Sequence, residues 1–449
     1  AVGRLLDARA QVNAPQADGM TALHWATYHD DFEMAKRLLA AGADAKAANR
    51  YGVTPLSLAC TNGNAELVEL LLDAGAEAKT ALAGGETVLM TAARTGRLGP
   101  VKALVARGAD IDAREHHGQT ALMWAAAEGH VEVVAALLEA GADFRTPLAS
   151  GFTPLFFAVR EGRSAVVFRL LEAGCQVNDL LRPERGGKAI SPLLLAVENG
   201  HFELAAALLE AGADPNAQPA GYAALHAITW VRKPIRGDGD PAPLGSGELG
   251  SLDLVRELAK QGAEVDARLK KGTSGRGRFT TTGSTPFLLA ARTGDVPLMR
   301  LLLELKADPS LTNADHSTPL LAAAGVGALG DGDEAAATED EAIAAVKLLL
   351  ELGADINAVD ANGETAMHGA AYQSLPKLVA LLADRGADIQ VWNRKNKWNW
   401  TPLMIAEGHR PGNFRPSSET IAAFERVFHA AGVPRPPRVQ AENRPDYGK

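Results

Sequence analysis

The sequence has too little cysteine, too little positive charge and too few long apolar runs for several classes of protein. Two cysteines, Cys60 and Cys175, cannot build a disulfide framework or a thiolate zinc site. Acidic residues number 54 against 45 basic ones, for a formal net charge of −9, whereas a general nucleic-acid-binding surface requires the opposite sign. No run of 18 or more apolar residues occurs. We therefore expect no nucleic-acid partner and no membrane span.

The N-terminal residues lack the charged start and the apolar stretch of a signal peptide. They also lack an initial methionine, so we expect other residues to precede them in the natural protein. The composition, 47% hydrophobic and 22% charged, is that of a folded chain with a large core. A chain of 449 residues would ordinarily divide into about three domains of roughly 150 residues each.

A recurring motif overrides that expectation and indicates the architecture. The motif is Gly-x-Thr/Ser-Pro/Ala-Leu, and its first five copies are 33 residues apart. Its third position is occupied by Thr21, Thr54, Thr87, Thr120, Thr153, Ser191, Ala223, Thr285, Thr318, Thr365 and Thr401. A leucine pair followed by Gly-Ala-Asp accompanies each motif, as at Leu38–Leu39 before Gly42. The later copies are more widely spaced, which predicts insertions in the second half of the chain.

The chemistry of each unit predicts two short helices and a turn. A hydroxyl residue such as Thr54 can cap a helix, and Pro55 then takes the first helical position, where its missing N–H costs nothing. Leucine and alanine three or four residues apart give this helix an apolar face. A glycine such as Gly63 ends it, and a second helix carries the leucine pair. The polar segment that follows is typical of an extended finger leading to the next unit.

The pattern G-x-T-P-L-H-x-A-A-x-x-G followed by L-L-x-x-G-A-D-x-N-A resembles the ankyrin repeat over nearly all of residues 1–432. The resemblance implies an all-α fold, an ankyrin-repeat solenoid of stacked helix-turn-helix units with finger loops. Local departures are Ala189, His316 and Asn399 in place of the finger glycine, and Ala223-Ala224 in place of Thr-Pro. They affect the geometry of single fingers rather than the fold.

Four segments follow from this assignment. Residues 1–14 are expected to be the C-terminal part of a truncated first repeat, and residues 15–217 to be regular repeats. Residues 218–432 are expected to be repeats with insertions, and residues 433–449 a disordered proline-rich tail.

The resemblance also implies a partner-binding surface on the inner helices and fingers. Matching positions in this chain are rich in tyrosine, tryptophan and arginine, which are frequent interface anchors. The predicted partner-binding residues are Tyr28, His29, Tyr51, Arg94, Phe152, Arg160, Tyr222, Trp230, Arg276, Arg292, Tyr372, Trp398 and Trp400. Packing against the neighbouring finger is the alternative for several of them. For Trp25 and Trp124, the apolar spacing favours packing inside the repeats.

The insertions offer a second location for binding. Residues 230–250, 325–339 and 408–417 fall between the two helices of their units, whereas residues 268–282 enlarge a finger. Insertions in repeat proteins often gather on the binding face, although surface loops are also tolerated because closure entropy rises slowly with length. The basic finger around Arg276 and the basic residues beside Trp398 and Trp400 could hold an anionic partner. Alternatively, the basic loops pair with the acidic residues 331–341 or remain solvated.

Signals for catalysis or cofactor binding are weak. The segment GVGALG at residues 325–330 matches G-x-G-x-x-G but lacks the preceding strand of a dinucleotide site. His116 and His117 lie near acidic residues, yet adjacent side chains of an extended finger diverge. No C-x-x-C-H motif occurs. We predict no catalytic residues, no metal and no cofactor.

The sequence therefore predicts a non-enzymatic scaffold that holds a protein on its concave surface and inserted loops. Two alternatives stay open: an accessory subunit of an enzyme complex, and small-molecule binding near Trp230, Trp398 and Trp400. The stretches GETVLMTAARTGR and HGQTALMWAAAEGH are similar to bacterial multi-ankyrin proteins. Because many of those are exported, the resemblance implies the periplasm or the cell exterior, and it leaves the partner unnamed.

Overall fold

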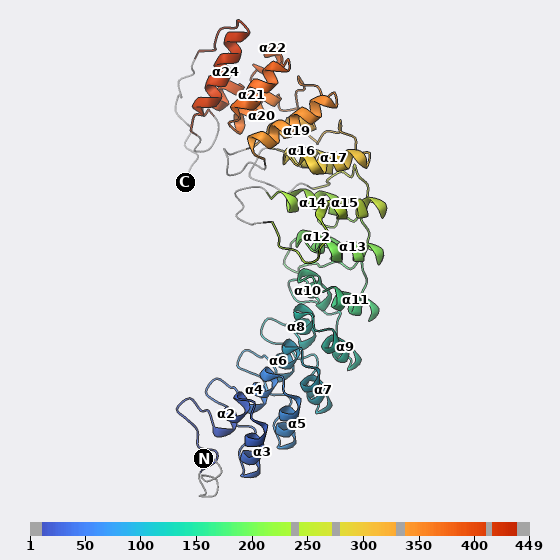
Figure 1. Cartoon of the computed structure of the whole chain (residues 1–449), viewed down its shortest axis with the longest axis vertical. Helices are drawn as coiled ribbons and strands as arrows, with labels where there is room; N and C mark the ends of the chain where they lie inside the picture. The colour runs from blue at the N-terminus through green and yellow to red at the C-terminus, as the bar shows by residue number, and fades with distance from the viewer. Residues whose placement is uncertain (1–10, 235–241, 272–278, 329–336, 410–414, 438–449) are drawn as a thin grey trace. The chain divides into compact units, whose positions relative to one another are not determined.

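The computed structural model describes residues 11–234, 242–271, 279–328, 337–409 and 415–437. Its contacts divide the chain into two compact units, residues 1–195 and residues 196–449, which we call the N-terminal and the C-terminal unit (Figure 1). The described residues form helices, turns and loops, with two isolated β-bridges and no strand. The all-α prediction is confirmed for this part of the chain.

The helices alternate between an inner one, which begins at the Thr-Pro-Leu motif, and an outer one that carries the leucine pair. In the N-terminal unit they are α2 (Ala22–Tyr28), α3 (Phe32–Ala40), α4 (Pro55–Asn62), α5 (Ala65–Asp73), α6 (Val88–Thr95), α7 (Leu98–Ala106), α8 (Ala121–Glu128), α9 (Val131–Glu139), α10 (Pro154–Arg160) and α11 (Ser164–Glu172). The boundary between the units falls within α12 (Pro192–Glu198).

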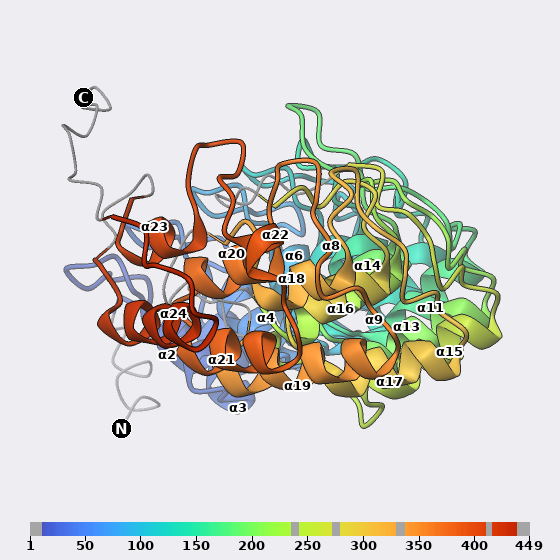
Figure 2. The same ribbon diagram turned by 90° about the horizontal axis from the view of Figure 1, so that it is seen from above.

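The C-terminal unit continues with longer connections. Its helices are α13 (Phe202–Glu210), α14 (Ala224–Arg232), α15 (Ser251–Lys260), α16 (Pro286–Arg292), α17 (Val296–Glu304), α18 (Pro319–Ala324), α19 (Glu339–Glu351), α20 (Ala366–Tyr372), α21 (Pro376–Asp384), α22 (Ile389–Trp392), α23 (Pro402–Ala406) and α24 (Ser418–Ala430). Figure 2 shows outer helices α15, α17, α19 and α21 in one row and inner helices α16, α18 and α20 in a second, with the fingers beyond the inner row.

The inner helices begin as the motif predicts. The Thr54 hydroxyl accepts the N–H of Ser57, and Thr285 and Thr318 cap α16 and α18 in the same way. Ala223 has no hydroxyl, and there the ring Nδ1 of His226 accepts the Ala223 N–H at 3.2 Å. A histidine therefore replaces the missing cap in the repeat that departs from Thr-Pro.

Left-handed residues end the inner helices and turn the fingers. Gly63 closes α4 with φ of 75°, a conformation in which a Cβ would be strained. His316 and Asn399 occupy finger-glycine positions and still adopt φ of 60° and 69°. The turn is therefore kept without glycine at these two fingers. Near Ala189 the finger differs, because the positive φ angles fall at Gly186 and Gly187 instead.

Polar clamps hold each repeat against the next. The Asn13 side chain donates to the Gly42 carbonyl at 3.0 Å and accepts the Asp44 N–H at 2.7 Å. Asn216 repeats both bonds to Gly262 and Glu264 in the C-terminal unit. Because these bonds join residues one repeat apart, they fix the register of the stack as well as its spacing.

The inserted segments lie where the spacing predicts, between α14 and α15, between α18 and α19, and between α23 and α24. The described part of the first insertion is closely held. The Ser246 N–H donates to His201 Nδ1 at 3.1 Å, and Gly245 lies so close to Gly200 that a Cβ on it would be 1.7 Å from the Gly200 carbonyl oxygen. This part of the insertion is therefore packed on the preceding repeat.

The predicted disordered tail begins too early. Within residues 433–437, Arg435 lies 2.8 Å from Glu407 and 2.9 Å from Glu425, so this stretch is tied to the last repeat by ion pairs. The rest of the predicted tail, residues 438–449, lies outside the described residues, as do residues 1–10 of the predicted truncated repeat. None of the helices in the described ranges combines the length and hydropathy needed to cross a bilayer.

Candidate functional site

Exposed aromatic side chains of the N-terminal unit are concentrated in its first two repeats. Trp25 and Tyr28 of α2 are 39% and 55% exposed, and Tyr51 on the following finger is 60% exposed. They are the large apolar side chains that the described residues of this unit leave exposed. Large apolar groups at the surface of a folded chain mark interaction sites when they cluster.

The α2 aromatics form a compact cluster with His29. The ring centroids of Trp25 and Tyr28 are 5.8 Å apart in an edge-to-face arrangement, and those of Trp25 and His29 are 5.9 Å apart and nearly parallel. The predicted residues Tyr28 and His29 are thus brought together. Trp25 was expected to pack inside the repeats, and its exposure corrects that expectation.

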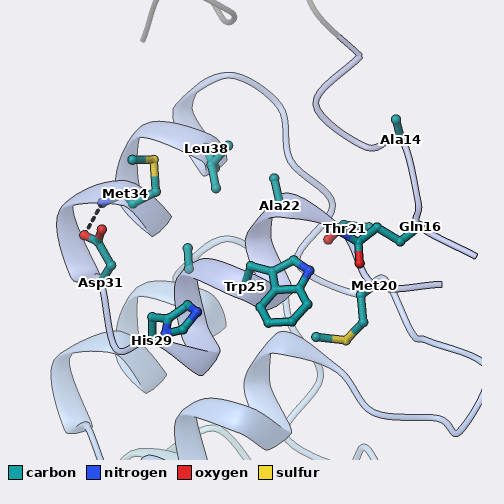
Figure 3. A pocket seen from close by; sticks show the side chains of 11 residues that line it. Ala14, Gln16, Met20, Thr21, Ala22, Trp25, His29, Asp31, Met34 and Leu38 are labelled. Atoms are coloured by element: carbon teal, nitrogen blue, oxygen red, sulfur yellow. Dashed lines mark hydrogen bonds between the residues drawn. The ribbon is translucent and has the colours of Figure 1, made fainter. Parts of the chain in front are cut away.

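A hollow of about 470 Å³ lies beside this cluster (Figure 3). Its walls are Trp25, Ala26 and His29 from α2 and Met34 and Leu38 from α3, together with Ala14, Gln16, Met20, Thr21, Ala22 and Asp31. Most of these side chains are apolar. The hollow can therefore take apolar side chains of another molecule.

Arginine side chains lie over aromatic rings along the same unit. The Arg50 guanidinium lies 4.7 Å from the centroid of the Tyr51 ring, and its Nη2 donates to the Tyr51 hydroxyl. The Arg94 guanidinium lies 5.6 Å from the ring centroid of Trp124, one repeat further on. Stacking of this kind restrains long side chains, so less conformational freedom is lost when a partner binds them.

Arg160 and Phe152 form the last group of this series. The Arg160 guanidinium lies 5.2 Å from the ring centroids of both Phe152 and Phe157, and its Nε donates to Glu161 at 2.8 Å. The matching position Arg94 lies 3.9 Å from Glu86. Both arginines are about 40% exposed at the side chain, so they can reach a partner without leaving the ring below.

The equivalent tyrosines of the C-terminal unit are in the interior. Tyr222 is 4% exposed, packs edge-on against Trp230 at 4.9 Å, and donates its hydroxyl to Glu198 at 2.6 Å. Burial, with the neighbouring Glu198 carboxylate, raises the pKa of the Tyr222 phenol far above its usual range. Tyr372 is 1% exposed and donates to Glu364 at 2.7 Å, and Asn396 contacts both groups. Neither tyrosine presents its ring to a partner.

The remaining predicted residues of this unit form separate groups. Trp398 and Trp400 stack at 6.1 Å between ring centroids, with the Lys397 ammonium 5.9 Å from the Trp398 ring. The Arg292 guanidinium lies 4.9 Å from the Phe279 ring, and burial lowers the pKa of Arg292 to about 10, so it stays charged at neutral pH. Arg276 lies outside the described residues.

Metal or nucleophile chemistry finds little support among the described side chains. No three His, Cys, Asp or Glu residues in this part of the chain converge as ligands for a metal ion. Burial raises the pKa of the Cys60 thiol to about 12 and that of Cys175 to about 11, so both thiols are protonated and poorly nucleophilic at neutral pH.

Comparison with known families matches the model for three copies of the ankyrin repeat to residues 1–81, 89–180 and 334–413. The single ankyrin-repeat model matches residues 190–219 and 282–314. Ankyrin-repeat proteins are generally non-enzymatic binding scaffolds for other proteins.

Curated relatives share stretches of the same repeats. The chain is 33% identical to the B-cell lymphoma 3 protein homolog of Mus musculus over 129 residues, 28% of this chain and 25% of that protein. It is 36% identical to "Ankyrin repeat, SAM and basic leucine zipper domain-containing protein 1" of Dasypus novemcinctus over 139 residues, 31% and 25% of the two chains. It is 27% identical to the E3 ubiquitin-protein ligase KEG of Arabidopsis thaliana over 164 residues, 35% and 9%.

The chain thus spans a quarter or less of the length of these relatives, and their animal and plant origins leave the bacterial type a prediction. The family models, in contrast, together match more than half of the chain, and the helix pairs, left-handed turns and fingers follow the same repeat. The chain belongs to the ankyrin-repeat family.

Proposed function

We propose that the protein is a non-enzymatic scaffold that holds a protein partner on the inner helices and fingers of its N-terminal unit. One observation carries the proposal. Exposed tyrosines and ring-stacked arginines occur at matching positions of successive repeats in this unit, whereas their counterparts Tyr222 and Tyr372 are buried. The contact residues we assign are Tyr28, Tyr51, Arg94 and Arg160.

The energetics favour these residues as anchors. Tyrosine and arginine carry a large share of binding energy at protein interfaces because they combine apolar area with hydrogen bonding. Here the arginines are already placed over Tyr51, Trp124 and Phe152, so the surface is partly ordered before the partner arrives. An accessory subunit of an enzyme complex would use the same surface and is one form of this proposal.

The small-molecule alternative has less support. It requires Trp230, Trp398 and Trp400 to line one pocket, whereas Trp230 packs on Tyr222 and the other two pack on each other in a different repeat. Two hollows in the described residues, one at α2 and α3 and one beside Phe156 and Cys175, are lined by other side chains. We therefore place the binding site on the N-terminal unit.

Site-specific photo-crosslinking in the native host tests this proposal. A photoreactive phenylalanine replaces Tyr51 on the proposed surface, Arg94 on the same surface, or, as a control, Glu69 on the exposed side of outer helix α5. We expect positions 51 and 94 to capture the same protein and position 69 to leave it uncaptured. Capture of that protein from all three positions, or from position 69 alone, would refute the assignment.

Binding measurements with the captured protein complete the test. The triple variant Tyr51→Ala, Arg94→Ala, Arg160→Ala should bind at least tenfold more weakly, because it truncates three anchors. The matched control Glu69→Ala should bind normally. Unchanged affinity of the triple variant would move the site to the insertions of the C-terminal unit.

A further inference from the structure

The hollow beside Trp25 is a distinct feature from the surface proposed above. It lies between α2 and α3 on the side of Ala14 and Gln16, where one ankyrin repeat normally meets another (Figure 3). Its volume of about 470 Å³ and its apolar walls of Met20, Met34 and Leu38 suit a small set of apolar side chains.

The repeat of α8 and α9 shows what covers the same positions elsewhere in the chain. Ala22, Trp25 and Met34 correspond to Ala121, Trp124 and Val133 three repeats later. Ala121 and Val133 are 1% and 0% exposed, whereas Ala22 is exposed and Met34 is half-buried. The covering elements there include helices α6 and α7, which pack against α8 and α9.

Helix α6 also supplies a cation to the tryptophan. Its C-terminal turn carries the buried Ala92 and Ala93 and then Arg94, whose guanidinium lies 5.6 Å from the Trp124 ring. Trp25 is the equivalent ring, and among the described residues it receives no lysine or arginine. The chain thus contains its own example of a helix that fits this type of surface.

The charge of the hollow favours the same kind of helix. Asp31 is the single lysine, arginine, aspartate or glutamate among the residues that line it, and its carboxylate is exposed while it accepts the Met34 N–H at 2.9 Å. The face of an indole ring attracts cations as well. A basic side chain placed over Trp25 would therefore meet two favourable groups at once.

We propose that this hollow is a docking surface for an amphipathic helix of a protein partner. The helix places small apolar residues against Ala22, Ala26 and Leu38 and a lysine or arginine over Trp25, as α6 does for Trp124. The proposal goes beyond the surface around Tyr51 and Arg94, because it concerns the end of the stack rather than its inner face.

The test uses a peptide with the sequence of residues 86–97, ETVLMTAARTGR, as the probe. A short helix is marginal in water, so the peptide carries a hydrocarbon staple and a fluorescent label. We expect saturable binding to the full chain by fluorescence anisotropy, at least tenfold weaker binding to Trp25→Ala, and unchanged binding to Tyr51→Ala. Replacing the peptide arginine that corresponds to Arg94 by alanine should weaken binding about two- to fivefold, through the lost cation–π contact.

A second variant guards against local unfolding. Asp31→Asn keeps the capping acceptor of α3 but removes the charge, so it should weaken binding about two- to threefold at low salt and not at high salt. Binding that is absent, or equal for wild type and Trp25→Ala, would overturn the proposal. Loss of peptide binding on Tyr51→Ala instead would assign the peptide to the inner surface.

Two other occupants are distinguished by further outcomes. If Leu5→Asp with Leu6→Asp increases peptide affinity tenfold or more, the chain's own first residues compete for the hollow, and the proposal of a partner helix fails. If sedimentation equilibrium shows that the wild type dimerises and Trp25→Ala does not, the occupant is a second copy, and the proposal fails as well. We expect a monomer in both cases and no effect of the two leucine substitutions.

Discussion

The two units are built from the same repeat, yet they treat their inner aromatic residues in opposite ways. In the N-terminal unit Tyr28 and Tyr51 are more than half exposed, whereas in the C-terminal unit Tyr222 and Tyr372 are almost completely buried. The difference comes from what surrounds each phenol. Glu198 and Glu364 accept the hydroxyls of the buried pair, which satisfies a polar group that would otherwise be costly to bury.

The insertions are a second part of the difference. In the C-terminal unit Arg232 at the end of α14 forms two bonds with Asp295 at the start of α17, and Lys233 pairs with Glu341 of α19. The insertion after α14 is thus tied to later repeats as well as to His201 before it. The same repeat can therefore serve as an open surface or as a braced one, depending on a few charged residues.

The largest expected effect tests this bracing. Arg232→Ala removes the partner of Asp295, which is 1% exposed, and leaves a buried carboxylate uncompensated. We expect the free energy of local unfolding of α16 and α17 to fall by about 3–5 kcal/mol. Hydrogen exchange of peptides from these helices measures it. The exposed pair of Arg256 and Asp253 provides the control, and Arg256→Ala should change the same quantity by less than about 1 kcal/mol. Equal effects of the two variants would contradict the bracing.

The next effect compares the two classes of tyrosine. Tyr372→Phe removes a buried hydroxyl bonded to the Glu364 carboxylate and should lower the stability of the C-terminal unit by about 1.5–3 kcal/mol. Tyr28→Phe removes an exposed hydroxyl and should change stability by less than about 0.5 kcal/mol. Urea denaturation followed by hydrogen exchange of each unit separates the two outcomes. A small effect at Tyr372 would mean that its buried network adds little.

A smaller effect concerns pH. Burial lowers the pKa of His226 and of His368 to about 4, whereas an unfolded histidine titrates near about 6.5. The unfolded chain therefore binds more protons between these values, and stability is full above about pH 6.5 and falls as the pH drops toward 4. From pH 7 to 5.5 we expect a loss of roughly 1 kcal/mol for each histidine. His24 is the corresponding histidine of the N-terminal unit, and burial lowers its pKa too.

Because the C-terminal unit has two such histidines with strongly lowered pKa values, its amides should lose more exchange protection on acidification than those of the N-terminal unit. The experiment compares exchange at pH 7 and 5.5 after correction for the intrinsic rates. Greater loss in the N-terminal unit would show that other groups dominate.

The smallest expected effect on stability sharpens the picture of the open surface. Tyr51→Ala truncates a side chain that is 60% exposed and should shift stability by no more than about 0.5 kcal/mol. Thermal unfolding monitored by circular dichroism measures the shift. A loss of 2 kcal/mol or more would show that Tyr51 and Arg50 serve the fold rather than a partner.

The repeat pattern predicted the helices well because their signals are local. Thr-Pro at the start and glycine at the end fix each inner helix through caps that involve neighbouring residues, as at Thr54 and Gly63. The insertions were placed correctly for the same reason, since each interrupts a recognisable unit. The start of the tail was misjudged because the ion pairs of Arg435 with Glu407 and Glu425 join residues that are not neighbours in sequence.

The candidate site was predicted only in part. Tyr28, Tyr51, Arg94 and Arg160 match positions that the repeat turns outward, and the structure finds them at least partly exposed. Tyr222 and Tyr372 match the same pattern and are nevertheless buried, while Trp25 followed the apolar spacing and is exposed. The signal that could have found the buried tyrosines is a glutamate near in sequence, such as Glu364 before Tyr372, although its contact depends on folding.

The sequence by itself determined that this chain is a stack of helix pairs, because capping, helix termination and apolar spacing act over a few residues and recur at a fixed period. Only the tertiary structure decided which inner side chains are open to a partner, and where a hollow remains beside Trp25. Exposure depends on what the neighbouring repeat places over a side chain, as Arg94 is placed over Trp124, and that contact joins residues a whole repeat apart.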